Sequence, residues 1–235
     1  MLFELTAEQA DMFAACTKAG SSDSARPILT GLQVEWEVEQ QPWKEASDDG
    51  PEIAPTTLLK LTLAATDSYM LATRTFELTE GYALEDDDDP KKGGSYLVEG
   101  KALVTAIASA RKATARTVPD EMRNIVFAFD NDGLQVTDRQ ATVSQTVRYI
   151  EGTYPNWRQL IPEPGADADL GNTAAFNPAY VKKLFDSIAP KATAVNGTNI
   201  PVRMEVHGAL KPAIFVHSKQ DTNSEWRGLL MPVRV

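Results

Sequence analysis

The sequence predicts an α+β fold in which a unit of one strand, one helix and three strands recurs three times. Three observations support this prediction. The 235 residues are 43% apolar and 24% charged, as expected for globular domains with apolar cores. The strand candidates alternate apolar and polar side chains, and the helix candidates repeat apolar residues every three to four positions. The order of these patterns returns at intervals of about 80 residues, which indicates an architecture built by repetition.

The first unit begins at the N-terminus. Leu2–Leu5 alternates as a strand, and Thr6 followed by Gln9 forms the capping-box pattern that opens a helix, here to about Ala19. Arg26-Pro27 would break any helix. Three strands are expected next, at Leu32–Glu37, Leu58–Thr66 and Met70–Leu78.

The second and third units repeat this order. In the second, a strand at Ser95–Glu99 and a helix at Gly100–Arg116 precede strands at Ile125–Asp130, Leu134–Asp138 and Val143–Ile150. In the third, a strand at Thr173–Phe176 and a helix from Asn177-Pro178 to Ala189 precede strands at Val202–His207, Ala213–Ser218 and Gly228–Val235. Asn177 and Pro178 are a favourable N-cap and first helical residue. We therefore divide the chain into 1–152, with two units, and 153–235, with a linker and one unit.

The charge distribution limits the classes of function. The net charge of −10 argues against a protein whose whole surface binds nucleic acid. Much of the negative charge lies in two stretches expected to be solvated loops, residues 39–56 and 80–92. No apolar run approaches the ~20 residues of a membrane span. The absence of a secretory signal and the single Cys16 favour a cytoplasmic protein without an internal disulfide.

Basic residues gather on the backs of two predicted helices. In the second helix Leu103, Ile107 and Ala110 form the apolar face, and no acidic residue interrupts the sequence. The cations of the two helices that we expect to contact DNA phosphates are Lys101, Arg111, Lys112, Arg116, Lys182 and Lys183. The first helix differs, because Glu8 and Asp11 lie on its outward face. A solvated helix face is the alternative interpretation for each helix taken alone.

Three segments resemble the bacterial DNA sliding clamp, the beta subunit family of DNA polymerase III. They are Thr66-Asp67-Ser68-Tyr69-Met70-Leu71-Ala72, the linker Glu151-Gly152-Thr153-Tyr154-Pro155-Asn156-Trp157-Arg158-Gln159-Leu160-Ile161-Pro162, and the tail Leu229-Leu230-Met231-Pro232-Val233-Arg234-Val235. Arg26-Pro27-Ile28-Leu29-Thr30-Gly31 is similar to a further segment of that family. Gln159 and Tyr69-Met70 depart from the family pattern, which has arginine and a His-Arg pair at these places.

This resemblance implies a non-catalytic ring that encircles duplex DNA, with helices lining the hole and no cofactor or metal. It also implies an outer hydrophobic cleft that binds short peptide motifs of DNA polymerase and clamp loader. The cleft residues carried over are Leu29, Thr66, Ser68, Tyr69, Met70, Leu71, Pro155, Gln159, Leu160, Leu229, Met231, Pro232, Val233 and Arg234. The family's ring resembles twelve such units, so three units per chain predict a closed homotetramer, with a homotrimer as the alternative. The length suggests a shortened version, of phage or mobile-element origin.

Two other functions stay open at this stage. A clamp-like scaffold could bind partner peptides without encircling DNA, which the acidic first helix favours. A nucleic-acid-processing enzyme would need catalytic groups, but His207 and His217 lie in strand-like runs and Cys16 lies on an apolar helix face. Neither a nucleophile–base pair nor a phosphate loop nor metal-ligand spacing is evident in the sequence.

Overall fold

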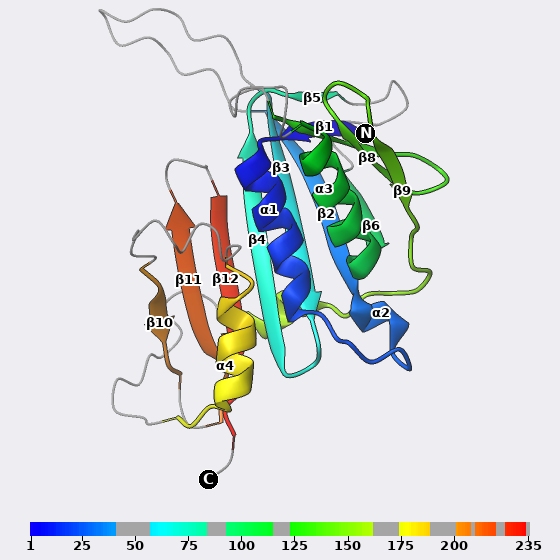
Figure 1. Cartoon of the computed structure of the whole chain (residues 1–235). Helices are drawn as coiled ribbons and strands as arrows, with labels where there is room; N and C mark the ends of the chain where they lie inside the picture. The colour runs from blue at the N-terminus through cyan, green and yellow to red at the C-terminus, as the bar shows by residue number, and fades with distance from the viewer. Residues whose placement is uncertain are drawn as a thin grey trace, which may run out of the picture.

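The computed structural model contains two antiparallel sheets and three main helices (Figure 1). It describes residues 1–40, 57–83, 93–114, 123–161, 174–188, 201–207, 210–219 and 224–233. The helical elements are α1 (Ala7–Cys16), α2 (Pro27–Thr30), α3 (Gly100–Thr114), α4 (Pro178–Phe185) and the 3-10 turns Thr17–Ala19 and Trp157–Leu160. The strands are β1 (Leu2–Leu5), β2 (Gly31–Gln40), β3 (Thr57–Thr66), β4 (Met70–Leu78), β5 (Tyr82–Ala83), β6 (Gly94–Glu99), β7 (Ile125–Phe129), β8 (Leu134–Asp138), β9 (Ser144–Val147), β10 (Arg203–Glu205), β11 (Ala213–Lys219) and β12 (Ser224–Leu230).

The order of elements follows the prediction, but several boundaries differ. β2 is longer than expected and β12 begins at Ser224 rather than Gly228, whereas β9 and β10 are shorter than expected. The first helix is α-helical only to Cys16 and continues as a 3-10 turn to Ala19. The predicted strand at Thr173–Phe176 is reduced to a single bridge, in which Ala175 pairs with Val233 while the described residues on either side of it are unpaired. The tail continues past β12 as an extended segment that includes the bridge at Val233. The predicted helix ends at Arg116 and Ala189 lie outside the described residues, and β5 was not predicted.

The two sheets are linked by a reciprocal exchange of strands. β1 leaves its own unit and pairs with β7, from Leu2↔Ala128 to Leu5↔Ile125, in a sheet of order β5-β1-β7-β8-β9. β6 makes the opposite exchange and pairs with β2, from Gly31↔Glu99 to Trp36↔Gly94. Each of the two units therefore supplies the first strand of the other unit's sheet.

The second sheet extends across the C-terminal unit, which we define as the described residues 174–188, 201–207, 210–219 and 224–233. Its order is β10-β11-β12-β4-β3-β2-β6. β12 pairs with β4 along its full length, from Ser224↔Phe76 to Leu230↔Met70. Segments about 150 residues apart in the chain thus form one continuous sheet.

Helices α1, α3 and α4 lie on the same side of the sheets (Figure 1). α1 and α3 pack side by side over the core, where Phe3, Phe13 and Phe127 stack at centroid distances of 5.1 to 6.3 Å. Burying three such side chains contributes on the order of 2 kcal/mol each. The common side of the helices separates the molecule into a helix layer and an outer sheet face.

The C-terminal unit is fixed to the rest of the protein by buried polar contacts. Arg74 of β4 is 1% exposed, and its guanidinium donates to Ser224 Oγ at 2.7 Å and to the carbonyl of Ile188. Burial lowers the pKa of Arg74 to about 10, so the side chain stays charged at neutral pH. Trp226 Nε1 donates to Ser187 Oγ at 3.1 Å. These hydrogen bonds join β4, β12 and the end of α4.

Among the described residues, no helix combines the length and the apolar character that crossing a membrane requires.

Candidate functional site

The helix layer carries the cations that the sequence singles out. Lys101 and Lys112 are exposed on α3 and have no ion-pair partner among the described residues. They lie on the side of α3 opposite Leu103 and Ile107, which are almost completely buried. The buried stripe of the helix therefore places these two ammonium groups on the outward side of this layer.

Arg111 also lies on α3, but its charge is shared with α1. Its guanidinium contacts both carboxylate oxygens of Asp11. Burial raises the pKa of Asp11, and this effect outweighs the opposing influence of Arg111. The acidic residue that the sequence placed on the first helix thus neutralises part of the positive charge of the second.

The two lysines of α4 have different surroundings. Lys182 is exposed and pairs with Asp186, one turn along, at 2.5 Å. Lys183 was expected to face DNA, but its ammonium donates to Asp67 Oδ2 at 3.0 Å and to the carbonyl of Gly20 at 2.9 Å. Its charge is used inside the protein, which changes its expected role from phosphate contact to structural link. Arg116 lies outside the described residues.

The outer sheet face carries a second, smaller apolar cluster. Its buried members are Ala64, Leu71, Trp157 and Leu229, and Tyr154 and Ile161 pack against them. Leu71 and Leu229 are register partners across β4 and β12, and their neighbours Met70 and Leu230 belong to the main core. Because side chains alternate along a strand, this outer cluster lies on the face opposite the helices.

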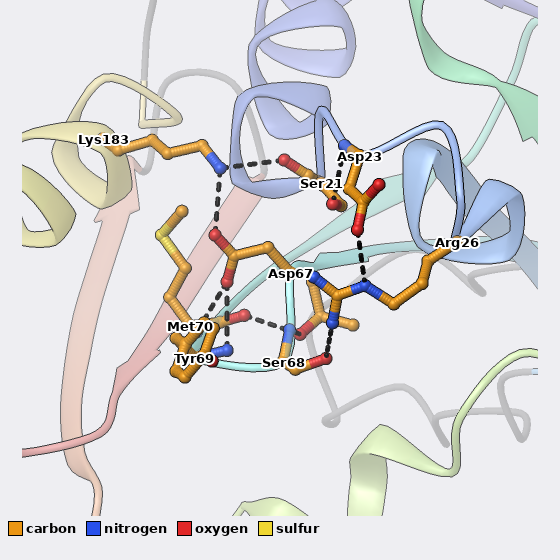
Figure 2. Close-up of polar contacts among 10 residues, drawn as sticks. Ser21, Asp23, Arg26, Asp67, Ser68, Tyr69, Met70 and Lys183 are labelled. Carbon is orange, nitrogen blue, oxygen red and sulfur yellow. Dashed lines mark hydrogen bonds and ion pairs between the residues drawn. The ribbon is translucent and has the colours of Figure 1, made fainter.

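A hairpin between β3 and β4 borders the outer cluster (Figure 2). Asp67 Oδ1 accepts from the backbone N–H groups of Tyr69 and Met70 at 3.0 and 3.1 Å, and Thr66 Oγ1 donates to the carbonyl of Met70 at 2.6 Å. Ser68 takes the left-handed conformation with φ of 79°. These bonds hold Tyr69 outward, 54% exposed, stacked on Tyr180 at 5.6 Å.

Lys183 and Arg26 connect this hairpin to other elements. Lys183 reaches Asp67 from α4, and Arg26 approaches Ser68 Oγ at 3.5 Å while pairing with Asp23 at 3.1 Å (Figure 2). The hairpin is therefore anchored both to the helix layer and to the loop before α2.

Most of the predicted cleft residues lie along this border. The exposed apolar side chains are Tyr69, Leu160, Met231 and Val233, with exposed fractions of 42 to 54%. Thr66, Met70, Leu71 and Leu229 are buried, Ser68, Pro155 and Gln159 are exposed, and Leu29 and Pro232 are half-buried. Met231 N donates to the carbonyl of Tyr69 at 3.2 Å, which brings the hairpin and the tail together. Arg234 lies outside the described residues.

Four further residues of this surface were not predicted. Trp157 is 6% exposed at the centre of the outer cluster, and Ala64, Tyr154 and Ile161 surround it. Burial raises the pKa of the Tyr154 phenol above its usual value. A tryptophan within a polar linker is the sequence signal that could have identified this position, because a large apolar side chain in a connecting segment needs a partner surface. Arg158 stacks on the Trp157 ring at 4.4 Å and covers it.

The described residues show no arrangement for covalent chemistry. They contain no group of three metal-ligating side chains. Cys16 is fully buried, and burial raises the pKa of its thiol to about 12. His207 is buried 3.8 Å from Glu205, and His217 contacts only the carbonyl of Pro201 among the residues described. The described residues instead place exposed lysines on the helix layer and exposed apolar side chains beside the outer cluster.

Comparison with known proteins rests on structure. Neither a family model nor a curated protein sequence matches the chain. The beta chain of DNA polymerase III from Streptococcus pneumoniae superposes with a TM-score of 0.62 and 18% identity over all of this chain. The DNA polymerase sliding clamp from Caulobacter crescentus superposes with a TM-score of 0.57 and 15% identity.

This chain has the sliding-clamp fold. It covers 65% of the length of both of those bacterial proteins. The A. fulgidus PCNA, solved with the C-terminal region of FEN-1, is matched with a TM-score of 0.58 and 11% identity over 98% of its length. The chain therefore shares its fold with these clamps, and sequence identities this low are evidence for the fold alone.

Proposed function

We propose that this protein is a DNA sliding clamp that encircles duplex DNA and tethers a polymerase without catalysing a reaction. The observation that carries the proposal is the position of α1, α3 and α4 on one side of the sheets, with Lys101, Lys112 and Lys182 exposed on that layer. In a closed ring these helices would line the hole. Phosphate contacts made by lysines carry no sequence information, so such a ring could slide along any sequence.

The outer cluster and its border would serve as the partner site. The buried floor of Leu71, Trp157 and Leu229 lies beside the exposed side chains of Leu160 and Met231. Apolar floors bordered by exposed anchors suit short peptides, whose apolar side chains supply most of the affinity. We assign this surface to peptide motifs of a DNA polymerase and of the clamp loader that would open the ring.

We further propose that the chain consists of two units in residues 1–152 and one in 153–235. Twelve units in a complete ring then require four chains. The proposed assembly is a closed homotetramer, cytoplasmic, and the alternative is a homotrimer. Among the described cations of α3 and α4, most are engaged by carboxylates, which supports enclosure as the means of retention, because a closed ring needs only weak phosphate contacts.

The decisive experiment measures retention on circular DNA. Nicked plasmid is incubated with the protein and a loader or at high protein concentration, the protein–DNA complex is isolated by gel filtration, and the plasmid is then linearised. A sliding clamp stays on the circle and leaves the linear DNA. Protein that leaves both forms at equal rates would exclude encirclement.

A charge-reversal series tests the helix layer. Lys101→Glu combined with Lys112→Glu and Lys182→Glu should reduce retention at least tenfold, because three attractive contacts become repulsive. Lys60→Glu is the matched control, since Lys60 lies on β3 beside Glu37 and Glu39 and its neighbours Leu59 and Leu61 point to the core. Equal retention of triple variant and control contradicts the assigned orientation of the helices.

A partner-binding scaffold that does not encircle DNA is the second candidate. It is favoured by the ion pairs that occupy Arg111, Lys182 and Lys183 and by the net charge of −10. The two functions differ in the plasmid experiment: the scaffold binds polymerase peptides but shows no dependence on DNA topology.

A further inference from the structure

The C-terminal unit exposes an apolar surface whose counterpart in the second unit is covered. The fourth and eighth residues of α3 are Leu103 and Ile107, which are 0% and 1% exposed. The same positions of α4 are Val181, which is half-buried, and Phe185, which is 39% exposed although its ring packs edge-on against Phe215 at 5.4 Å. Phe185 packs on the sheet and is still accessible to solvent, which indicates that a further packing element can cover it.

In the N-terminal part, that neighbour is the sister unit. α1 lies beside α3, and strands β1 and β6 are exchanged between the two sheets. Both exchanged pairs are antiparallel, so the two units are related approximately by a two-fold rotation. The described part of the C-terminal unit has neither a second helix over α4 nor an exchanged strand at the edge of β10.

Within the described residues, the segment at Ala175 and strand β10 each have one edge without a pairing partner. Val98, just before α3, bridges Tyr149 on one side and pairs with Leu32 of β2 on the other. Ala175, just before α4, makes the corresponding bridge to Val233, but no described strand lies on its other side. β10 is the edge strand of its sheet and carries Met204, 55% exposed.

We propose that two copies of this chain join through their C-terminal units around a two-fold axis, each placing the strand at Ala175 beside β10 of the other copy. The exchange reproduces between chains what β1 and β6 do within one chain. It would cover Phe185, Val181 and Met204 with the same surface of the second copy, which makes the contact isologous. β9 of another copy does not fit this place, because in both sheets the exchanged partner is the first strand of a unit.

Another edge strand is β9, Ser144–Val147, the last strand of the five-stranded sheet. Its sequence SQTV has no charge and no proline, the residues that commonly prevent edge pairing. The corresponding last strands β4 and β12 pair antiparallel with each other. Two copies of β9 can pair in this way around a second two-fold axis.

With two different two-fold contacts per chain, a ring closes only with an even number of chains. Four chains give the twelve units of the proposed clamp, so this arrangement of the ring rests on the proposed function. The contact between C-terminal units does not, because it follows from the exposed surface and the free strand edges.

Light scattering after gel filtration tests the proposal on the full chain. The wild type should have the mass of four 25.7-kDa chains. Phe185→Glu should halve this mass, because charge at the centre of one contact leaves dimers held by β9. Met204→Asp should do the same without altering a side chain that packs on the core. Ser144→Lys with Thr146→Lys should also give dimers, since like charges then face each other across the other axis. All four substituted positions lie outside the buried core.

Combination and control variants distinguish this arrangement from a head-to-tail ring. Phe185→Glu together with the β9 lysines should give single chains, and Val104→Asp, on the outward side of α3, should leave the mass unchanged. In a head-to-tail ring every contact joins one end to the other, so either set of substitutions alone would give single chains. That result would overturn the proposal. An unchanged mass for Phe185→Glu and Met204→Asp would also overturn it. So would a wild type that is a single chain at about 50 µM, since the contact would then be weaker than ~6 kcal/mol.

The outcome is separable from that of the proposed function. A wild-type assembly of four chains that leaves circular and linear DNA equally fast would refute encirclement and keep the two-fold contacts. Conversely, the protein could be retained on circular DNA while either set of substitutions alone gives single chains. That outcome would support encirclement and refute the two-fold contacts.

Discussion

Helices α3 and α4 occupy corresponding places in their units, yet their surroundings differ. α3 has a complete apolar stripe under cover of α1 and the five-stranded sheet, and its free lysines face outward. α4 has a larger apolar side chain at the eighth position, partly exposed, and both of its lysines are engaged by carboxylates. The apolar face of α3 is therefore covered by other elements of the same chain, whereas the apolar face of α4 is partly exposed and can pack against another surface.

The largest expected effect concerns folding. Leu103→Ala should lower the free energy of unfolding by about 3 kcal/mol, because it empties a fully buried site. Phe185→Ala should cost less than about 1 kcal/mol per chain at low protein concentration, since the side chain is partly exposed there. Urea unfolding at two protein concentrations measures both. A concentration-independent loss of 3 kcal/mol for Phe185→Ala would mean that α4 is already fully packed.

The next effect concerns the outer cluster, which combines strands from both parts of the molecule. Leu160→Glu and Met231→Glu should each weaken binding of a clamp-binding peptide about tenfold, because a charge replaces an apolar anchor that is about half exposed. Fluorescence anisotropy with a labelled polymerase peptide measures this. Leu210→Glu, at a residue that is 67% exposed on another loop, is the control. Equal weakening by all three would place the peptide elsewhere.

A smaller effect is expected from the ion pair between α1 and α3. Asp11→Asn should strengthen DNA retention about two- to fivefold at low salt, because Arg111 is released from its carboxylate partner. The gain should shrink in 0.5 M salt. Glu225→Gln is the matched control, since it releases Arg227 on β12 in the same way but on the outer face. A loss of retention in Asp11→Asn would show that the pair positions Arg111 rather than neutralising it.

The smallest effect is chemical reactivity at one site. The raised pKa of Cys16, about 12, keeps its buried thiol protonated in the folded protein, so labelling by a disulfide reagent at pH 8 should follow unfolding alone. A cysteine introduced by Phe185→Cys should label rapidly in dilute protein and slowly in concentrated protein. Rapid labelling of native Cys16 would indicate that the α1 side of the core opens as readily as the α4 side.

Local patterns in the sequence predicted most of the elements but not how they are joined. The capping box at Thr6 and Gln9 forms as expected, and the strands expected at 58–66 and 70–78 are present. The exchange of β1 and β6 was not predicted, because alternation tells which face of a strand is buried and not which strand lies beside it. The pairing of β12 with β4 was missed for the same reason.

The candidate site was predicted unevenly. The tail and the hairpin at Thr66–Met70 come together with the linker, as the resemblance implied. The contact of Lys183 with Asp67 could not be predicted from helical spacing, because Asp67 lies 116 residues earlier in the sequence. Trp157 was passed over because it lies in a polar connection, where an apolar side chain gives no periodic signal.

The free edge of β10 has a consequence for direction. Rotation about a two-fold axis in the plane of an annulus exchanges its top and bottom, so a ring built from such contacts has no front and no back. The outer clusters of neighbouring chains would then be oriented alternately upward and downward. A polymerase could be engaged whichever way round the ring had been threaded, and half of the outer clusters would always be left for a second enzyme on the opposite side.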